Sequence, residues 1–425
     1  MSAARPLTAT PEAAELLIQL LADPDVVLQQ DAATWMSIAR EAARQGVLPL
    51  LHARMRTLPA GTVPAEVLAV VNERYIELAL QSALIFRELD TIASALADRG
   101  IPVMLLKGLH LAVDVYDARA QRTMGDIDIM VPRDRLADAE QALAGAGFGV
   151  QPVADLDDFC RTNPHLPRMT PPLGRGVGVE VHWTIERPTS PFDIRHEELW
   201  EHARTVNVDG RVMHVLSPEQ LTLHLCLHAC FHHRFEHTPL KQLCDLAVLL
   251  KRYGPELDWD VLIGTAQRWR VGSFVRFTLL LTHALFGAEV PKSVRALSAD
   301  AEEARLLENA RAFILNCTIA VPTAFQHALR ARSLPKRFSG TAVHVFPPPA
   351  RLAAIYNLPR GSARVFLWYL VRPFDLLLRK GRMTLELLMP GRTRRRLRYS
   401  EENRALLKQS LRKWAHAARP PADHA

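Results

Sequence analysis

The chain has 425 residues, of which 48% are hydrophobic and 23% charged, a composition typical of soluble globular proteins with two or three packed units. Five cysteines are too few for a disulfide scaffold, and the sequence shows neither a secretory signal nor a run of about 20 apolar residues, so we expect a cytoplasmic protein without a membrane-spanning helix. The net charge of +7 comes from residues 351–425, which carry a net +12, whereas residues 1–350 carry a net −5.

Residues 1–99 are predicted to form a helical N-terminal region. Apolar residues recur at helical spacing in residues 11–58, and one of these helices is expected over Ala32–Arg44. A long helix is expected over Ala65–Arg99, because an apolar face runs along it. Gly100 is predicted to end this helix, as a glycine after the last helical turn often does.

Residues 100–215 show a different pattern, in which short strands alternate with helices. The expected strands are Ile101–Leu106, Asp126–Val131, a segment starting near Phe148 and Val177–Ile185, and the expected helices are Leu109–Tyr116 and Pro132–Ala144. Residues 152–178 are rich in Pro, Gly and Arg and are predicted to form an irregular loop. This alternation indicates a small α/β or α+β unit.

Asp126 and Asp128 are the most informative residues of the chain. Residues two apart in a strand point to the same face, so both carboxylates are expected side by side, with Ile127 and Ile129 in the core. Two adjacent carboxylates repel unless a cation lies between them, and Mg²⁺ prefers oxygen ligands. The pattern favours a site for Mg²⁺ or Mn²⁺, although an Asp-x-Asp also occurs on the solvent face of an amphipathic edge strand.

Two other segments support the metal-binding interpretation. Lys107 and Gly108 lie at a predicted strand-to-helix turn, where backbone N–H groups and a lysine can receive a phosphate. Glu180 is a polar residue of a later alternating strand. If that strand pairs beside the Asp-x-Asp strand, Glu180 becomes the third carboxylate of one cluster.

In this order of elements the sequence resembles the DNA polymerase beta-type nucleotidyltransferase superfamily, and within it an uncharacterised bacterial nucleotidyltransferase family. The matching residues are Gly100-Ile101-Pro102, Leu106-Lys107-Gly108, Tyr116, Arg122, Asp126-Ile127-Asp128 and Glu180-Val181-His182-Trp183, within a likeness over roughly residues 30–255. The resemblance implies an α+β fold: a polymerase beta-like core over residues 100–215, with a small mixed sheet and helices, flanked by helical regions. The superfamily generally has Gly-Ser or Gly-Gly where this chain has Lys107-Gly108, so triphosphate binding is either supported by the lysine charge or altered.

The resemblance also implies a reaction: metal-dependent transfer of an NMP group from an NTP, ATP first, to an unidentified acceptor hydroxyl, with release of pyrophosphate. It implies that Asp126, Asp128 and Glu180 are the catalytic and metal-binding residues. The residues expected to contact the nucleotide are Lys107, Gly108, Arg122, His228 and Lys241. For Arg122, contact with the phosphates and pairing with the carboxylates are both open. The alternative is a non-catalytic protein on the same fold that binds a nucleotide or a partner, such as a membrane-surface accessory of a biosynthetic cluster.

Residues 216–330 are predicted to form a helical C-terminal domain, with helices over Leu221–Phe231 and Leu240–Tyr253. His224, His228 and His232 recur at helical spacing on one face. Such histidines either bind zinc or line a cleft as hydrogen-bonded interior residues. The absence of an HExxH motif and of paired CxxC motifs favours the second interpretation.

Residues 331–425 are predicted to form a Pro-containing linker and a partly helical basic tail. The tail contains the cationic cluster Arg392–Arg398 together with several aromatic residues. Arginines with aromatics suit either an anionic membrane, which would place the protein peripherally on the inner membrane surface, or a nucleic acid. A solvated arginine-rich tail explains the same composition. No recognised nucleic-acid module supports the second partner.

Overall fold

The computed structural model describes residues 11–151, 153–172, 176–236, 238–296, 301–316, 346–349, 352–353, 356, 364–372 and 392–419. The chain divides into two compact units. The sheet unit comprises Ala9–Leu307 and Ser410–Ala425, and the tail unit comprises Met1–Thr8 and Glu308–Gln409. The predicted domain boundaries at residues 99, 215 and 330 stay a proposal, because this division does not test them.

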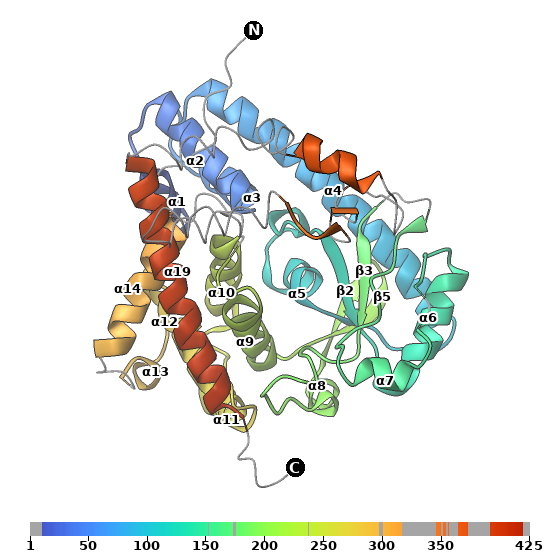
Figure 1. The fold of residues 1–425 in the computed structure, drawn as a ribbon. Helices are drawn as coiled ribbons and strands as arrows, with labels where there is room; N and C mark the ends of the chain where they lie inside the picture. The colour runs from blue at the N-terminus through green and yellow to red at the C-terminus, as the bar shows by residue number, and fades with distance from the viewer. Residues whose placement is uncertain are drawn as a thin grey trace. The chain divides into compact units, whose positions relative to one another are not determined.

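The sheet unit begins with a layer of helices. These are α1 (Pro11–Ala22), α2 (Ala32–Arg44), α3 (Leu48–Met55) and α4 (Ala65–Ala97) (Figure 1). The Asp31 carboxylate caps α2 by accepting the Thr34 N–H at 2.8 Å. Gly100, at φ +62°, ends α4, and the Ile101 N–H then donates to Leu96 O at 3.0 Å, which satisfies a terminal carbonyl. The predicted long helix and its glycine end are thus confirmed.

Within the described part of the chain, five strands form one sheet in the order β3-β2-β1-β5-β4. They are β1 (Met104–Leu105), β2 (Asp126–Met130), β3 (Gly178–His182), β4 (Arg204–Val208) and β5 (Arg211–Val215). β2 is parallel to β3 and antiparallel to β1, β1 is parallel to β5, and β4 is antiparallel to β5. A mixed sheet with helices before and after it in the sequence confirms the predicted α+β class.

Helices α4 and α6 (Leu136–Gly145) cover one face of the sheet (Figure 1). The apolar residues of β2 and β3 that pack against this layer are Ile127, Ile129, Val179 and Val181. Because side chains alternate along a strand, the polar residues between them project from the opposite face. That face contacts α5 (Lys107–His110), which follows β1 and continues as η1 (Leu111–Val115), one turn of π-helix. The apolar alternation therefore decides which face carries the polar cluster.

The predicted strand near Phe148 is wrong. The Phe148 N–H donates to Leu143 O at 3.0 Å, so this residue closes the turn that follows α6 and does not begin a strand. Gly149 then forms an isolated bridge with Thr170. The predicted irregular loop that follows contains a short helix, α7 (Leu156–Cys160). Two more short helical segments are η3 (Arg133–Arg135), which precedes α6, and α8 (His196–Glu201), which follows β3.

The sequence reasoning did not anticipate the hairpin of β4 and β5. Its turn residues, Asp209 at φ +52° and Gly210 at φ +88°, both lie in the left-handed region, as a two-residue turn between twisted strands requires. The Asn207 side chain accepts the Gly210 N–H at 2.9 Å. An Asp-Gly pair between two alternating segments is therefore the signal that marks this hairpin.

Helices follow the sheet, as predicted. They are α9 (Pro218–Leu227), η5 (His228–His232, a π-helical turn), α10 (Pro239–Tyr253), α11 (Trp259–Arg268), α12 (Gly272–Phe286) and α13 (Lys292–Ala296). Ser217 and Gln220 form a capping box that begins α9. Helices α9, α10 and α12 contact one another and bury most of their side chains, which explains their high apolar content.

The described residues of the tail unit include a small apolar cluster of Leu352, Ala353 and Val365, beside which Tyr356 stacks on Trp368 at 4.0 Å. Two helices cross the unit boundary: α14 (Ala301–Asn316) and α19 (Arg392–Ala417). Most of the predicted linker, and the side chains of the Arg392–Arg398 cluster, lie outside the described residues. No helix within the described ranges is both long and apolar enough to cross a membrane.

Candidate functional site

Strands β2 and β3 bring together the carboxylates that the sequence predicts as metal ligands. In their parallel register Asp128 lies opposite Glu180, and Met130 lies opposite His182. Asp126 begins β2 two residues before Asp128, so the backbone alternation places both on the same face. The sheet therefore presents three carboxylates and one imidazole on the face that α4 and α6 do not cover.

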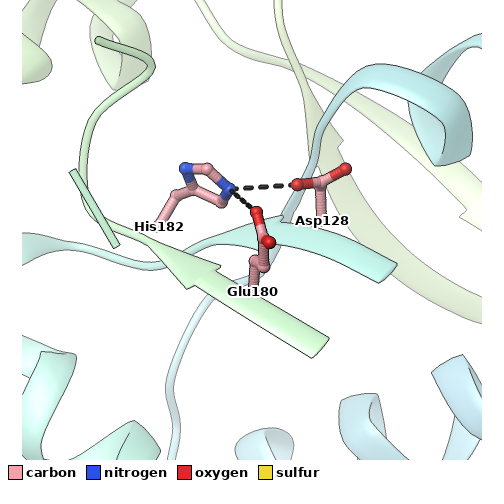
Figure 2. Close-up of side chains that lie close together, drawn as sticks. All are labelled: Asp128, Glu180 and His182. Carbon is pink, nitrogen blue, oxygen red and sulfur yellow. Dashed lines mark hydrogen bonds and ion pairs between the residues drawn. The ribbon is translucent and has the colours of Figure 1, made fainter. Parts of the chain in front are cut away.

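Asp128, Glu180 and His182 converge (Figure 2). His182 Nε2 lies 3.0 Å from Asp128 Oδ1 and 3.6 Å from Glu180 Oε2. One potential ligand atom from each residue lies within 4.8 Å of the other two. The side chains of Asp128 and His182 are 4% and 5% exposed, whereas that of Glu180 is 21% exposed, so the cluster is reached from the Glu180 side.

Lys107 completes this arrangement from the turn between β1 and α5. Its Nζ lies 2.7 Å from Asp128 Oδ1. The backbone of Lys107 has φ +44°, a left-handed conformation that residues other than glycine rarely adopt. Burial lowers the pKa of Lys107, but Asp128, together with Glu180 and Asp126, outweighs burial and raises the pKa above its ordinary value. Lys107 is therefore a fixed positive charge at the cluster.

The three carboxylates differ in their affinity for protons. Burial raises the pKa of Asp128, but Lys107 and His182 more than offset this and hold it well below its usual range. Burial and the neighbouring Asp128 charge raise the pKa of Asp126. Contact with His182 lowers the pKa of Glu180 against the effect of burial. Asp126 thus experiences the like-charge repulsion that an added cation would relieve.

Gly108 and Arg122 have structural partners. A Cβ on Gly108 would lie 2.8 Å from Met124 Cγ, so the close packing of α5 on the segment before β2 leaves no space for a side chain. The Arg122 guanidinium donates to both oxygens of Asp245 on α10, at 2.6 and 2.8 Å. Tyr116 Oη donates to the same carboxylate at 2.8 Å. Arg122 therefore pairs with Asp245, a carboxylate outside the β2–β3 cluster.

Lys241 lies one turn before Asp245 on α10, with its aliphatic chain against Gly46. A Cβ on Gly46, whose φ is +72°, would lie 3.1 Å from Lys241 Cδ. Burial, together with the nearby Arg122 charge, lowers the pKa of Lys241 to about 8. Helical spacing alone would pair Lys241 with Asp245, but the Asp245 carboxylate accepts from Arg122 instead.

The histidines of α9 and η5 form side-chain pairs. His228 Nε2 lies 3.1 Å from His233 Nε2, and His232 Nε2 lies 2.9 Å from Glu186 Oε2. Burial lowers the pKa of both His224 and His228 well below the ordinary value, so both are neutral at neutral pH. In the described ranges these histidines do not form a group of three close ligand atoms, so the geometry favours hydrogen-bonded interior residues over a zinc site.

A comparison with known protein families shows to which family the chain belongs. A family model described as an uncharacterised nucleotidyltransferase matches residues 31–287, which is more than half of the chain. The chain belongs to this nucleotidyltransferase family. None of the curated proteins matches it. The chain is similar to the antibiotic-resistance factor ANT(2'')-Ia, whose solution structure is known, with 18% sequence identity. The match covers 48% of this chain and 97% of ANT(2'')-Ia, with a TM-score of 0.30.

Family membership confirms the predicted resemblance and the enzyme class. In this nucleotidyltransferase the structure brings Lys107, Asp128 and Glu180 together, and it places Arg122 at a buried ion pair instead. The sequence reasoning did not assign His182 to the site, although its position two residues after Glu180 places it on the same strand face. It also left the partner of Arg122 unidentified.

Proposed function

We propose that this nucleotidyltransferase moves an NMP group from an NTP, with ATP as the first candidate, to an acceptor hydroxyl and releases pyrophosphate. The observation that supports this proposal best is the pairing of Asp128 with Glu180 across β2 and β3. Asp126 lies on the same strand face, and Lys107 lies 2.7 Å from Asp128. Carboxylates grouped next to a fixed cation suit a metal-bound triphosphate.

The donor set fits a divalent cation. Asp126, Asp128 and Glu180 are proposed to hold Mg²⁺ or Mn²⁺, since two of these carboxylates already lie within 4.8 Å of a common imidazole and the third carries an unfavourable charge. The bound ion would neutralise charge on the phosphates and favour ionisation of the acceptor hydroxyl.

Glu180 is proposed to act as the general base. It is the most exposed member of the Asp128–Glu180–His182 cluster, and its lowered pKa keeps it ionised at neutral pH. The acceptor oxygen forms a bond to the α-phosphorus, and its proton passes to Glu180. The bond from the α-phosphorus to the bridging oxygen breaks, and the electron pair leaves with pyrophosphate. The charged Lys107 ammonium stabilises negative charge on the phosphates.

Residues of the helical region are proposed to complete the nucleotide site. The neutral His228 offers a hydrogen bond without a charge, and Lys241 offers an ammonium group that is paired with neither Asp245 nor, in the described part of the chain, another carboxylate. Arg122, fixed by Asp245, is proposed to act mainly by holding the segment that leads into β2. Gly108 allows the turn to approach this segment.

Lys241 gives a pH-dependent prediction. Its lowered pKa of about 8 means that the ammonium is charged near neutral pH and loses its proton as the pH rises through about 8. We therefore expect kcat/KM for the NTP to fall above that pH. Lys241→Met should remove this decline and lower kcat/KM near neutral pH by about 10- to 100-fold, since a charged hydrogen bond contributes about 1.5–3 kcal/mol.

The matched control is Lys251→Met, an exposed lysine on the same helix. It should leave both the pH profile and the rate near neutral pH unchanged. Steady-state kinetics between about pH 6 and 10 measure both variants. An unchanged alkaline decline in Lys241→Met would assign that titration to another group.

The proposed reaction is tested by label transfer. The full chain is incubated with a cell lysate as the source of acceptors, with Mg²⁺ or Mn²⁺, and with each α-³²P-labelled NTP in turn. We expect label from the α-position to reach an acceptor, and no label from γ-³²P-ATP. Loss of transfer in an Asp126→Ala, Asp128→Ala double variant of unchanged circular dichroism would assign the chemistry to this site. Label from the γ-position would instead mean a kinase-type reaction and would refute the proposal.

The contact between Lys107 and Asp128 also supports the alternative of nucleotide binding without turnover, because the ammonium occupies an oxygen that a metal ion would use. In that case each NTP would bind in an equilibrium titration, while no α-label would reach any acceptor. Binding accompanied by release of pyrophosphate would exclude this alternative.

A further inference from the structure

His182 places an imidazole nitrogen inside the carboxylate cluster. Within the described residues, the potential ligand atoms that lie within 4.8 Å of one another come from Asp128, Glu180 and His182, and Asp126 is not among them. His182 and Glu180 share one face of β3, and both point toward Asp128 (Figure 2). The three-carboxylate set expected from the sequence is therefore not the most compact donor set.

The shorter of the two distances from His182 Nε2 matches that between neighbouring ligands of a single ion. Two donor atoms bound at about 2.1 Å and at right angles to each other lie about 3 Å apart. His182 Nε2 lies 3.0 Å from Asp128 Oδ1 and 3.6 Å from Glu180 Oε2. Because Nε2 carries at most one proton, it cannot donate a hydrogen bond to both carboxylates. One cation between the three atoms satisfies all of them.

The charge around His182 also favours a cation. Asp126, Asp128 and Glu180 lie on one face of the sheet. Lys107 pairs with Asp128, and Arg168 is near enough to lower the pKa of Asp126. Two basic side chains against three carboxylates leave an excess of negative charge at a largely buried position, which is unfavourable until a cation binds.

We propose that His182 is a metal ligand, and that its nitrogen makes the site prefer a first-row transition ion, Mn²⁺ first, over Mg²⁺. Mg²⁺ takes oxygen ligands, whereas imidazole suits transition ions and carboxylates also accept Mn²⁺. His182 Nε2, Asp128 and Glu180 bind the ion together. The expectation of a divalent cation rests on the proposed function, but the ligand set and the preference concern the ion alone.

Binding of Mn²⁺ to the full chain, without nucleotide, tests the proposal. Electron paramagnetic resonance should detect bound Mn²⁺, and its electron spin echo should show modulation by a histidine ¹⁴N nucleus. The modulation should change when the protein contains ¹⁵N-labelled histidine. Displacing half of the Mn²⁺ should require at least about a 10-fold excess of Mg²⁺, since nitrogen ligands favour the transition ion.

Two variants identify the nitrogen. His182→Gln should abolish the modulation and weaken Mn²⁺ binding by about 10- to 100-fold. The control is His196→Gln, a histidine that lies 3.4 Å from Glu197 outside the cluster and that should keep both the modulation and the affinity. Modulation that persists in His182→Gln, or that disappears in His196→Gln, would overturn the assignment.

If His182→Gln does not fold, measurements on the wild-type protein test whether a histidine nitrogen coordinates the ion. Bound Mn²⁺ without nitrogen modulation, no Mn²⁺ binding at all, or displacement by an equal concentration of Mg²⁺ would each refute the proposal. The outcome is separable from that of the proposed function. Nitrogen coordination in a chain that transfers no nucleotide would contradict only the reaction, and nucleotidyl transfer without nitrogen coordination would contradict only the ligand assignment.

Discussion

Replacing Asp128 by asparagine is expected to lower kcat for nucleotidyl transfer by about 10³-fold or more, because the residue proposed as a metal ligand loses its charge. Asp128 Oδ1 is the common partner of Lys107 Nζ and His182 Nε2, at 2.7 and 3.0 Å. The amide keeps the shape of the side chain but neutralises it. Lys107 then loses its nearest counter-charge, and only the more distant Asp126 and Glu180 remain to attract its ammonium.

The effect is measured as single-turnover transfer of α-label, with circular dichroism as the test of folding. The matched control is Asp134→Asn, an exposed aspartate six residues further along, which should keep the wild-type rate. A folded Asp128→Asn variant that stays within about 10-fold of wild type would exclude Asp128 from the chemistry, since that factor corresponds to only about 1.4 kcal/mol.

The face of the sheet that carries the site could be predicted from the sequence. Alternation of Asp126 and Asp128 with apolar residues predicts a strand with one polar face, and Glu180 shows the same alternation in a second strand. The predicted order of the elements pointed to the family resemblance, and the match to the family model confirms that resemblance. Alternation alone, however, does not tell which strands pair or in which register.

The partners of the site residues could not be predicted, because they depend on that register and on tertiary packing. Glu180 faces Asp128 only because β2 and β3 pair in parallel in this register, and a shift of β3 by one residue would turn Glu180 toward the apolar layer, away from Asp128. Arg122 and Asp245 are 123 residues apart. No local pattern connects them, because helical spacing alone would pair Asp245 with Lys241, one turn before it on the same helix.

Two errors about the fold have local causes. Phe148 follows Gly147, and an aromatic residue after a glycine suggests a new strand, but Gly147 at φ +91° lets the chain fold back on α6. The hairpin of β4 and β5 was missed although Asp209-Gly210 is a strong turn signal. Few of its strand residues are buried, only Val208 in β4 and Met213 and Val215 in β5, so the apolar signal of these strands is short.

Asp245→Ala is expected to destabilise the protein by about 3–5 kcal/mol, because it leaves a buried guanidinium without a counter-charge. The side chains of Arg122 and Asp245 are 11% and 2% exposed, and Tyr116 loses its acceptor in the same change. The pair joins the segment before β2 to α10, so its loss separates the sheet from the helical region. Urea denaturation followed by circular dichroism measures the free energy of unfolding.

Two comparisons separate this ion pair from the general effect of removing an aspartate. Asp193→Ala breaks an exposed pair with Arg270 at 3.2 Å and should cost no more than about 1 kcal/mol. The double variant Arg122→Met, Asp245→Leu removes both charges together and should recover most of the lost stability, since the cost of Asp245→Ala comes mainly from the unpaired charge that remains. Equal losses in Asp245→Ala and Asp193→Ala would show that the buried pair does not hold the sheet to α10.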